Sequence, residues 1–346
     1  MTVPVLLTSA ATASMRSMGG MRPVSFSWHA ALTDWQTGPF SLATVLVLLA
    51  VAYWYLRADW RLAGRGRRWP ARRTASFMVG LFSIDLAVQS PVATFTASYF
   101  QAHVIQHLLL MVVAPPLLAL GAPSTLLLQT STRRVKTLWL RVLKSRGFAL
   151  LTFPGTVFCL YFGVMFAFFL TSLINTAMLN MWLMDVFNVV FFFGATLYWW
   201  PLVGLDPIVH WRMGYGARML SILLGGPPEV ILGLAILSSS HPIASMYSLA
   251  STRAGGGMLW VATEASALIG FVPVFLQWAR ADERAAKRID ERRAATPAHV
   301  DNRVTTSVRT APTLLNSDDE IWKAYWVTRT GAVPSAREWV PNSPQE

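Results

Sequence analysis

The chain has 346 residues, of which 54% are hydrophobic and 13% are charged, roughly half the charged fraction of an average soluble domain. This composition excludes a disordered chain, a coiled coil and most soluble enzymes. Lysine and arginine outnumber aspartate and glutamate by 29 to 17, which gives a net charge of +12, and the single cysteine, Cys159, excludes an internal disulfide and a CxxC redox site.

Seven stretches are long and apolar enough to cross a membrane, since a spanning helix needs about 20 mostly apolar residues. In chain order they are Phe40–Leu56, Ala75–Phe95, Tyr99–Leu120, Phe148–Ile174, Met181–Val203, Ala217–Ser238 and Met258–Gln277. The third contains Pro115-Pro116, which must kink or end the helix there. The sequence therefore predicts an all-α, polytopic membrane protein with seven transmembrane helices.

Basic residues gather in alternate connections between these stretches. Seven arginines separate the first and second, six basic residues separate the third and fourth, two precede or begin the sixth, and six directly follow the seventh. The connections between the others hold Arg253 alone. The positive-inside rule then places the N-terminus outside and the C-terminus in the cytoplasm. The excess charge marks the cytoplasmic side of a cytoplasmic membrane protein, so no nucleic-acid partner is expected.

This topology predicts three parts of the chain. Residues 1–39 form an outer N-terminal segment, residues 40–278 form the seven-helix transmembrane domain, and residues 279–346 form a charged cytoplasmic helix followed by a flexible tail. The third part is rich in charge and contains proline, which does not favour a packed core.

Six ionisable side chains lie inside the predicted spans, where polar groups are costly and mark function by default. They are Asp85, His103, His107, Asp185, Glu229 and Glu264. The predicted topology puts all six at the membrane midplane or in its outer half, and no lysine or arginine lies well inside a span to neutralise the acids. Either the acids are protonated, which suits Asp85 best, or a cation neutralises them.

A pair of histidines gives this cluster its chemical character. His103 and His107 are four residues apart and share one helix face, and Met111 continues the same stripe. Imidazole with carboxylate suits copper(II), zinc or iron, and imidazole with thioether suits copper. The sequence therefore predicts a metal site with His103 and His107 as primary ligands. A hydrogen-bonded contact between helices is the alternative explanation of the histidine pair.

Several motifs resemble the CtaG family of cytochrome c oxidase assembly factors, the seven-helix membrane type. The first is His103-x-x-Gln106-His107-Leu108-Leu109, followed by Ala114-Pro115-Pro116-Leu117-Leu118. Trp200–Pro207, Gly255-Gly256-Gly257 with Trp260, and Gln277-Trp278 follow in the same order as in the family. The resemblance covers roughly residues 28–295. It implies a non-enzymatic protein that helps to mature a copper-containing terminal oxidase and supplies or inserts the copper.

The sequence departs from the family pattern at the predicted metal site. Members carry histidines early in the fifth span and in the middle of the sixth, where this chain has Asp185 or Asn188, and Glu229. The predicted site is therefore His103 and His107 with Asp185, Glu229 and Glu264, supported by Gln106, Asn188, Asp85 and Met111. Replacing histidine by carboxylate hardens a site and weakens copper(I) relative to copper(II), zinc or iron. Copper is the expected metal, with zinc or iron as alternatives.

The expected partners are membrane lipid and the subunits of a terminal oxidase or another copper chaperone. A metal or proton transporter is the first alternative function, because transporters use midplane acids and helix breaks such as Pro115-Pro116. A haem protein is the second, although two histidines on one face of one helix could not bind opposite sides of one haem. No nucleophile–base pair or cofactor loop is visible, so an enzyme is not expected.

Overall fold

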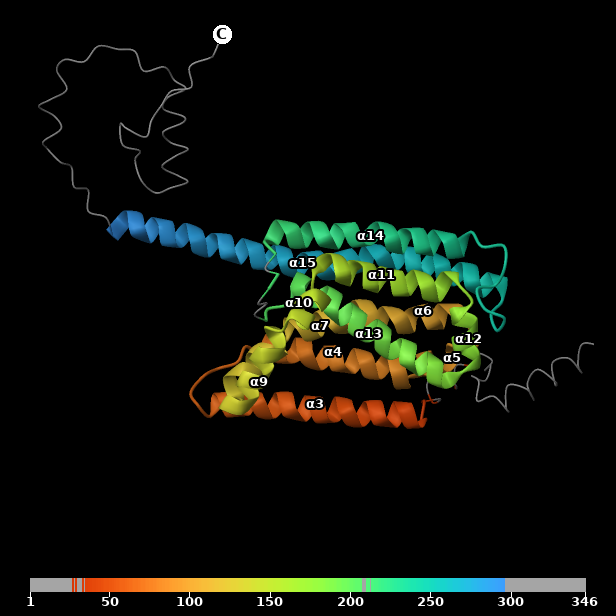
Figure 1. The fold of residues 1–346 in the computed structure, drawn as a ribbon, viewed down its shortest axis with the longest axis horizontal. Coiled ribbons are helices and arrows are strands. Elements are labelled where there is room, and N and C mark those ends of the chain that lie inside the picture. The colour runs from red at the N-terminus through yellow and green to blue at the C-terminus, as the bar shows by residue number, and fades with distance from the viewer. Residues whose placement is uncertain are drawn as a thin grey trace, which may run out of the picture. The chain divides into compact units, whose positions relative to one another are not determined.

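The computed structural model describes residues 27, 29, 33, 35–206, 210, 211 and 213–295, and every regular element of these residues is a helix (Figure 1). The predicted outer segment and cytoplasmic tail therefore lie largely outside the described residues. In chain order the elements are α3 (Pro39–Ala63), α4 (Ala71–Gln89), α5 (Pro91–Phe95), α6 (Phe100–Leu108), the π-helix η1 (Leu109–Val113), α7 (Ala114–Leu120), α8 (Pro123–Thr130), α9 (Arg133–Leu143), α10 (Arg146–Leu151), α11 (Pro154–Leu170), α12 (Leu173–Leu179), α13 (Met181–Val203), α14 (Tyr215–Leu237) and α15 (Leu249–Ala295).

The polytopic, all-helical prediction is confirmed. Within the described residues, six helices or helix runs are long and apolar enough to cross a membrane, and α11 with α12 makes a seventh if this bent pair counts as one span. The fifth predicted span matches α13 at both ends. The fourth is interrupted, because α11 and α12 meet at an angle of 73°. The chain divides into two compact units, of which the first ends at Arg284 and holds the whole helix bundle.

The third span continues past its two prolines because a side chain of another helix donates a hydrogen bond to the backbone carbonyl that the prolines leave unpaired. Pro115 has no N–H, so the carbonyl of Met111, four residues earlier, lacks its usual helical partner. The π-helix η1 widens the turn here, and the indole N–H of Trp199 on α13 donates to the Met111 carbonyl oxygen at 2.8 Å. The predicted kink is therefore a wide turn fastened to a neighbouring helix.

Replacing Trp199 with phenylalanine is expected to destabilise the bundle by about 1–3 kcal/mol, because the buried Met111 carbonyl would lose its partner. Thermal unfolding of the purified protein in detergent, followed by fluorescence, should show a midpoint several degrees lower. Trp200→Phe on the neighbouring residue is the matched control. An equal shift in both variants would contradict the role given to the Trp199 hydrogen bond.

Helices α14 and α15 approach closely through glycine. A Cβ on Gly233 would lie 2.9 Å from the backbone nitrogen of Trp260 and 3.2 Å from the carbonyl oxygen of Gly256. Gly270 of α15 makes a similar close approach to α13, since a Cβ on this glycine would lie 2.6 Å from the ring of Trp199. Small residues commonly allow this close contact between membrane helices. The glycines of the sixth and seventh spans thus fix the position of Glu229 on α14 relative to α15.

Helix α9 has the pattern of a helix that lies in a membrane interface. Its apolar side chains Val135, Leu138 and Val142 are 41%, 59% and 40% exposed, while Leu143 is buried against the bundle. Trp139 anchors the helix by donating its indole N–H to the Ser124 hydroxyl at 3.2 Å. The remaining face carries basic side chains, namely Arg133, Arg134, Lys136 and Arg141.

The start of α8 is capped from a distant part of the chain. Ala122 at its N-cap has a left-handed backbone, with φ of 51°, and supplies no side-chain cap. Instead, the Asp206 carboxylate accepts hydrogen bonds from the backbone N–H of Ser124 at 3.1 Å and from the N–H and hydroxyl of Thr125, both at 2.7 Å. Burial raises the pKa of Asp206, and the hydrogen bonds from Thr125 and Ser124 oppose this shift.

Candidate metal-binding site

The two predicted primary ligands meet in the centre of the bundle. His103 and His107 lie one turn apart on α6, and their side chains are 0% and 5% exposed. Their Nε2 atoms are 2.9 Å apart, a hydrogen-bond distance at which one imidazole donates and the other accepts. The sequence prediction that these residues share a face is confirmed.

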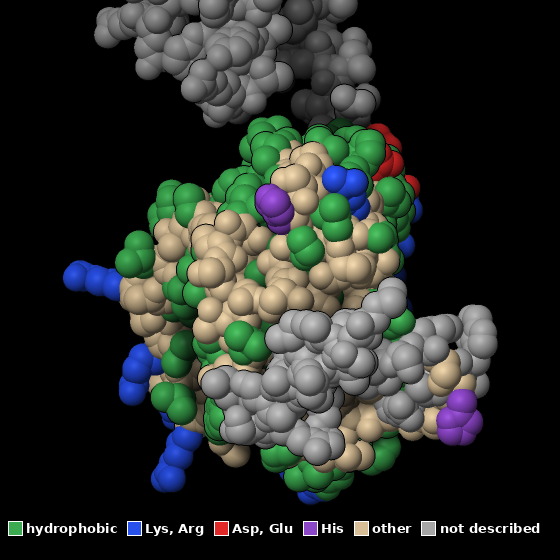
Figure 2. Space-filling model, turned by 90° about the vertical axis from the view of Figure 1, so that its right-hand side faces the viewer, with side chains coloured by type: hydrophobic (Ala, Val, Ile, Leu, Met, Phe, Trp, Pro, Cys, Tyr) green, Lys and Arg blue, Asp and Glu red, His purple; other side chains and the backbone are tan. Residues whose placement is uncertain are grey.

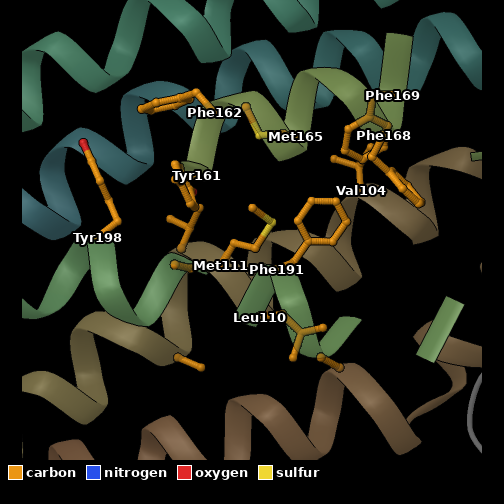
Figure 3. Close-up of a cluster of buried hydrophobic side chains, with 14 of the residues drawn as sticks. Val104, Leu110, Met111, Tyr161, Phe162, Met165, Phe168, Phe169, Phe191 and Tyr198 are labelled. Atoms are coloured by element: carbon orange, nitrogen blue, oxygen red, sulfur yellow. The ribbon is translucent and has the colours of Figure 1, made fainter. Parts of the chain in front are cut away.

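Aromatic rings surround the pair and keep it dry. Phe168 on α11 stacks parallel to His103 with ring centroids 6.1 Å apart, and Phe191 on α13 meets His107 edge-on at 4.8 Å. Phe169 contacts both imidazoles edge-on. Figure 3 shows these phenylalanines in the core cluster, close to Val104 of α6. This packing and the hydrogen bond between the two Nε2 atoms hold the imidazole rings in place.

Neither histidine has a second hydrogen bond to hold its other nitrogen. The Nδ1 atoms of His103 and His107 are both buried, and neither has a partner among the described protein atoms. A buried polar atom without a partner is unusual in a folded protein. Metal-binding histidines, in contrast, usually donate this second N–H to a carboxylate or carbonyl.

The geometry of the pair is compatible with a metal ion. Metal–imidazole bonds are about 2.0–2.1 Å long, so two nitrogens 2.9 Å apart would subtend roughly 90° at a shared ion. Binding would require each imidazole to present a bare Nε2 and to keep its proton on Nδ1. The separation of the two Nε2 atoms is therefore compatible with both binding one ion.

Soft and acidic side chains line a small cavity beside His107. Its volume is about 20 Å³, enough for one water-sized group. Met111 from η1, Met165 and Tyr161 from α11, and Glu229 from α14 all line it together with His107. Figure 3 shows the side chains of Met111 and Met165 between Tyr161 and Phe191. The sequence did not predict that Met165 lies near the histidines, because only the packing of α11 brings this residue next to η1.

The predicted carboxylates are not gathered around the histidines. Glu229 is 8% exposed and accepts a hydrogen bond from the Ser266 hydroxyl at 3.2 Å. Among the predicted acidic ligands, it alone lines the cavity next to His107. Glu264 is exposed on α15, and Asp85 is half-buried on α4. No group of three or more His, Cys, Asp or Glu side chains in the described part of the chain is close enough to hold a metal ion.

Asp185 and Asn188 instead line a second, larger cavity with Gln106. This cavity has a volume of about 810 Å³ and lies between the first turns of α3 and α13, the end of α4, and α5 and α6. The amide nitrogen of Gln106 donates to the Ala87 carbonyl at 2.9 Å. Of the four predicted supporting residues, Gln106 and Asn188 therefore line this cavity, Met111 lines the smaller one, and Asp85 lines neither.

Comparison with known proteins identifies a family to which the chain is similar. A family model described as the cytochrome c oxidase caa3 assembly factor, Caa3_CtaG, matches residues 53–281. An uncharacterized protein of Mycobacterium leprae is 28% identical over 87% of this chain, and one of Mycobacterium bovis is 27% identical over 84%. These alignments cover 48% and 46% of the relatives, so the chain spans about half the length of the curated relatives it matches. No solved structure matches the chain.

Proposed function

Because the chain belongs to the family of cytochrome c oxidase caa3 assembly factors, we propose that it binds copper at His103 and His107 and supplies it to a terminal oxidase. The observation that carries the proposal is the buried histidine pair, whose Nε2 atoms lie 2.9 Å apart. An oxidase subunit or a further copper chaperone would be the partner. The protein would act in the cytoplasmic membrane as a binding protein and not as an enzyme.

The carboxylate replacements in the sequence predict a harder site, but only Glu229 of these acids lies beside His107, together with two thioethers, and this set of donors supports copper(I) over harder ions. The additional donors beside His107 are the thioethers of Met111 and Met165, and soft sulfur ligands select copper(I). Glu229 is the one acid among the described residues that line this cavity, and its carboxyl group, once ionised, would supply a single negative charge to balance a monovalent ion bound by two neutral imidazoles. A divalent ion would leave a net positive charge in an apolar core, which is costly.

Metal binding is tested on the full purified chain under reducing conditions. Titration with copper(I) against a competing chelator is expected to give one ion per chain, and zinc(II) is expected to bind more weakly. X-ray absorption should report imidazole nitrogen with thioether sulfur. Protein that takes up no copper, or that prefers zinc, would overturn the copper proposal.

The assembly role is tested separately in the host. Deleting the chain should lower the activity and the copper content of the terminal oxidase, and the intact chain should restore both. Restoration by a variant that lacks the histidine pair would separate assembly from copper binding. Normal oxidase activity in the deletion strain would refute the assembly role.

A further inference from the structure

The cavity of about 810 Å³ is large enough for an organic ligand and lies apart from the histidine pair. Pockets that bind small molecules usually measure about 300–1,000 Å³ and are mostly apolar with a few placed polar groups. The cavity lies at the end of the bundle that carries α5 and α12, which is the end predicted to face outside. Figure 2 views this end, and where described residues are visible it shows mostly hydrophobic side chains, backbone and uncharged side chains, with few charged ones.

The apolar part of the lining suits a hydrocarbon chain. Phe40 from α3 and Val88 from α4 line it together with alanines of α5 and its C-terminal flank. Met181 and Trp182, at the start of α13, form part of the same lining and are 46% and 78% exposed. In a membrane-spanning chain such exposed apolar side chains contact lipid, so the cavity borders a surface where a molecule of the bilayer would lie.

The polar part of the lining offers several hydrogen-bond acceptors, and none of its described residues is a cation. Asp185 is half-buried, and no Lys, Arg or His is among the described residues that line the cavity. Asn188 is 7% exposed, and its Oδ1 is buried without a hydrogen-bond partner. The amide nitrogens of Gln106 and Gln36 already donate to Ala87 and Thr94, so both side chains have an acceptor oxygen to offer.

We propose that this cavity binds an amphiphile with a protonated primary amine as its head group. An ammonium has three donors and no acceptor, which complements the Asp185 carboxylate and the amide oxygens of Asn188 and Gln106. Its positive charge would neutralise a carboxylate that has no basic partner in the lining, and a lone charge at membrane depth is costly. A metal ion alone would leave most of this volume and its apolar wall unfilled.

Two sources share this chemistry, namely an aminophospholipid and a free long-chain amine. Native mass spectrometry of the full purified chain can separate them. The probes are phosphatidylethanolamine, phosphatidylcholine with matched acyl chains, dodecylamine and dodecanol. Phosphatidylcholine also carries a positive head group but has no N–H to donate, so it tests for the hydrogen bonds.

Phosphatidylethanolamine is expected to be retained at least about tenfold more than phosphatidylcholine if the source is a lipid. Retention of dodecylamine over dodecanol without a preference between the two lipids would indicate a free amine. Asp185→Asn, which removes the charge and keeps the shape, should abolish whichever preference is seen. Asp59→Asn is the matched control, because Asp59 lies on α3 away from the cavity lining and bonds to the Thr74 hydroxyl.

Two results would overturn the proposal. One is that the chain retains phosphatidylethanolamine no better than phosphatidylcholine and dodecylamine no better than dodecanol. The other is that the Asp185→Asn variant has the same thermal unfolding midpoint as the intact chain and keeps the same preference for the amine. Neither result depends on whether the histidine pair binds copper, so the two proposals fail independently.

Discussion

Replacing either His103 or His107 with alanine is expected to lower the copper(I) affinity of the chain by at least about 100-fold. The loss of a hydrogen bond to a metal ligand already costs about 10–100-fold, and the loss of the ligand itself removes a coordinate bond. Competition with a chelator of known affinity measures the change. The double variant should bind more weakly than either single variant, because it removes both imidazole donors.

His241→Ala is the control for this prediction, since His241 is an exposed histidine in the loop between α14 and α15. Its copper stoichiometry and affinity should equal those of the intact chain. The thermal unfolding midpoints of all variants need to be compared, because removing a buried imidazole leaves a cavity. Copper binding that survives in folded His103→Ala and His107→Ala variants would place the site elsewhere.

Replacing Asp206 with alanine is expected to destabilise the bundle by at least about 2 kcal/mol, because even one hydrogen bond to a charged group contributes about 1.5–3 kcal/mol. The change removes all three hydrogen bonds that the carboxylate accepts at the start of α8. The favourable interaction of a carboxylate with a helix N-terminus is lost as well. Thermal unfolding in detergent measures the effect.

Asp206→Asn should restore part of this stability, because the amide retains one acceptor oxygen for Thr125 or Ser124. The order of stability is thus the intact chain, then Asp206→Asn, then Asp206→Ala. An Asp206→Ala variant that unfolds at the normal temperature but fails to support oxidase assembly would assign Asp206 to a partner contact and not to the fold.

Hydropathy and helical spacing predict the span count and the histidine pair because both are local properties of the sequence. The boundaries of α13 and the shared face of His103 and His107 follow from the order of residues within one helix. The π-helix does not, because its carbonyl partner Trp199 comes from a different helix. The sharp bend between α11 and α12 likewise depends on packing against neighbours.

The sequence could not predict which acids join the histidines, because this depends on the rotation of each helix about its axis. Depth in the membrane is readable from position in a span, and it places Glu229 and Glu264 near the same level. The structure turns Glu229 inward, where Ser266 of α15 reaches it, and leaves Glu264 exposed on α15 two residues before that serine. Asp185 and Asn188 face a different cavity from the one beside His107.

The unpartnered Nδ1 atoms of His103 and His107 have a kinetic consequence under the proposed function. In permanent metal sites, the second nitrogen of each imidazole donates a hydrogen bond to a neighbouring group, and this hydrogen bond raises the basicity of the ligand. Here aromatic packing orients the rings, but no group in the described part of the chain accepts a hydrogen bond from the second nitrogen. Copper held in this way would have a short residence time, and an acceptor with stronger ligands would remove it readily, as delivery to another protein requires.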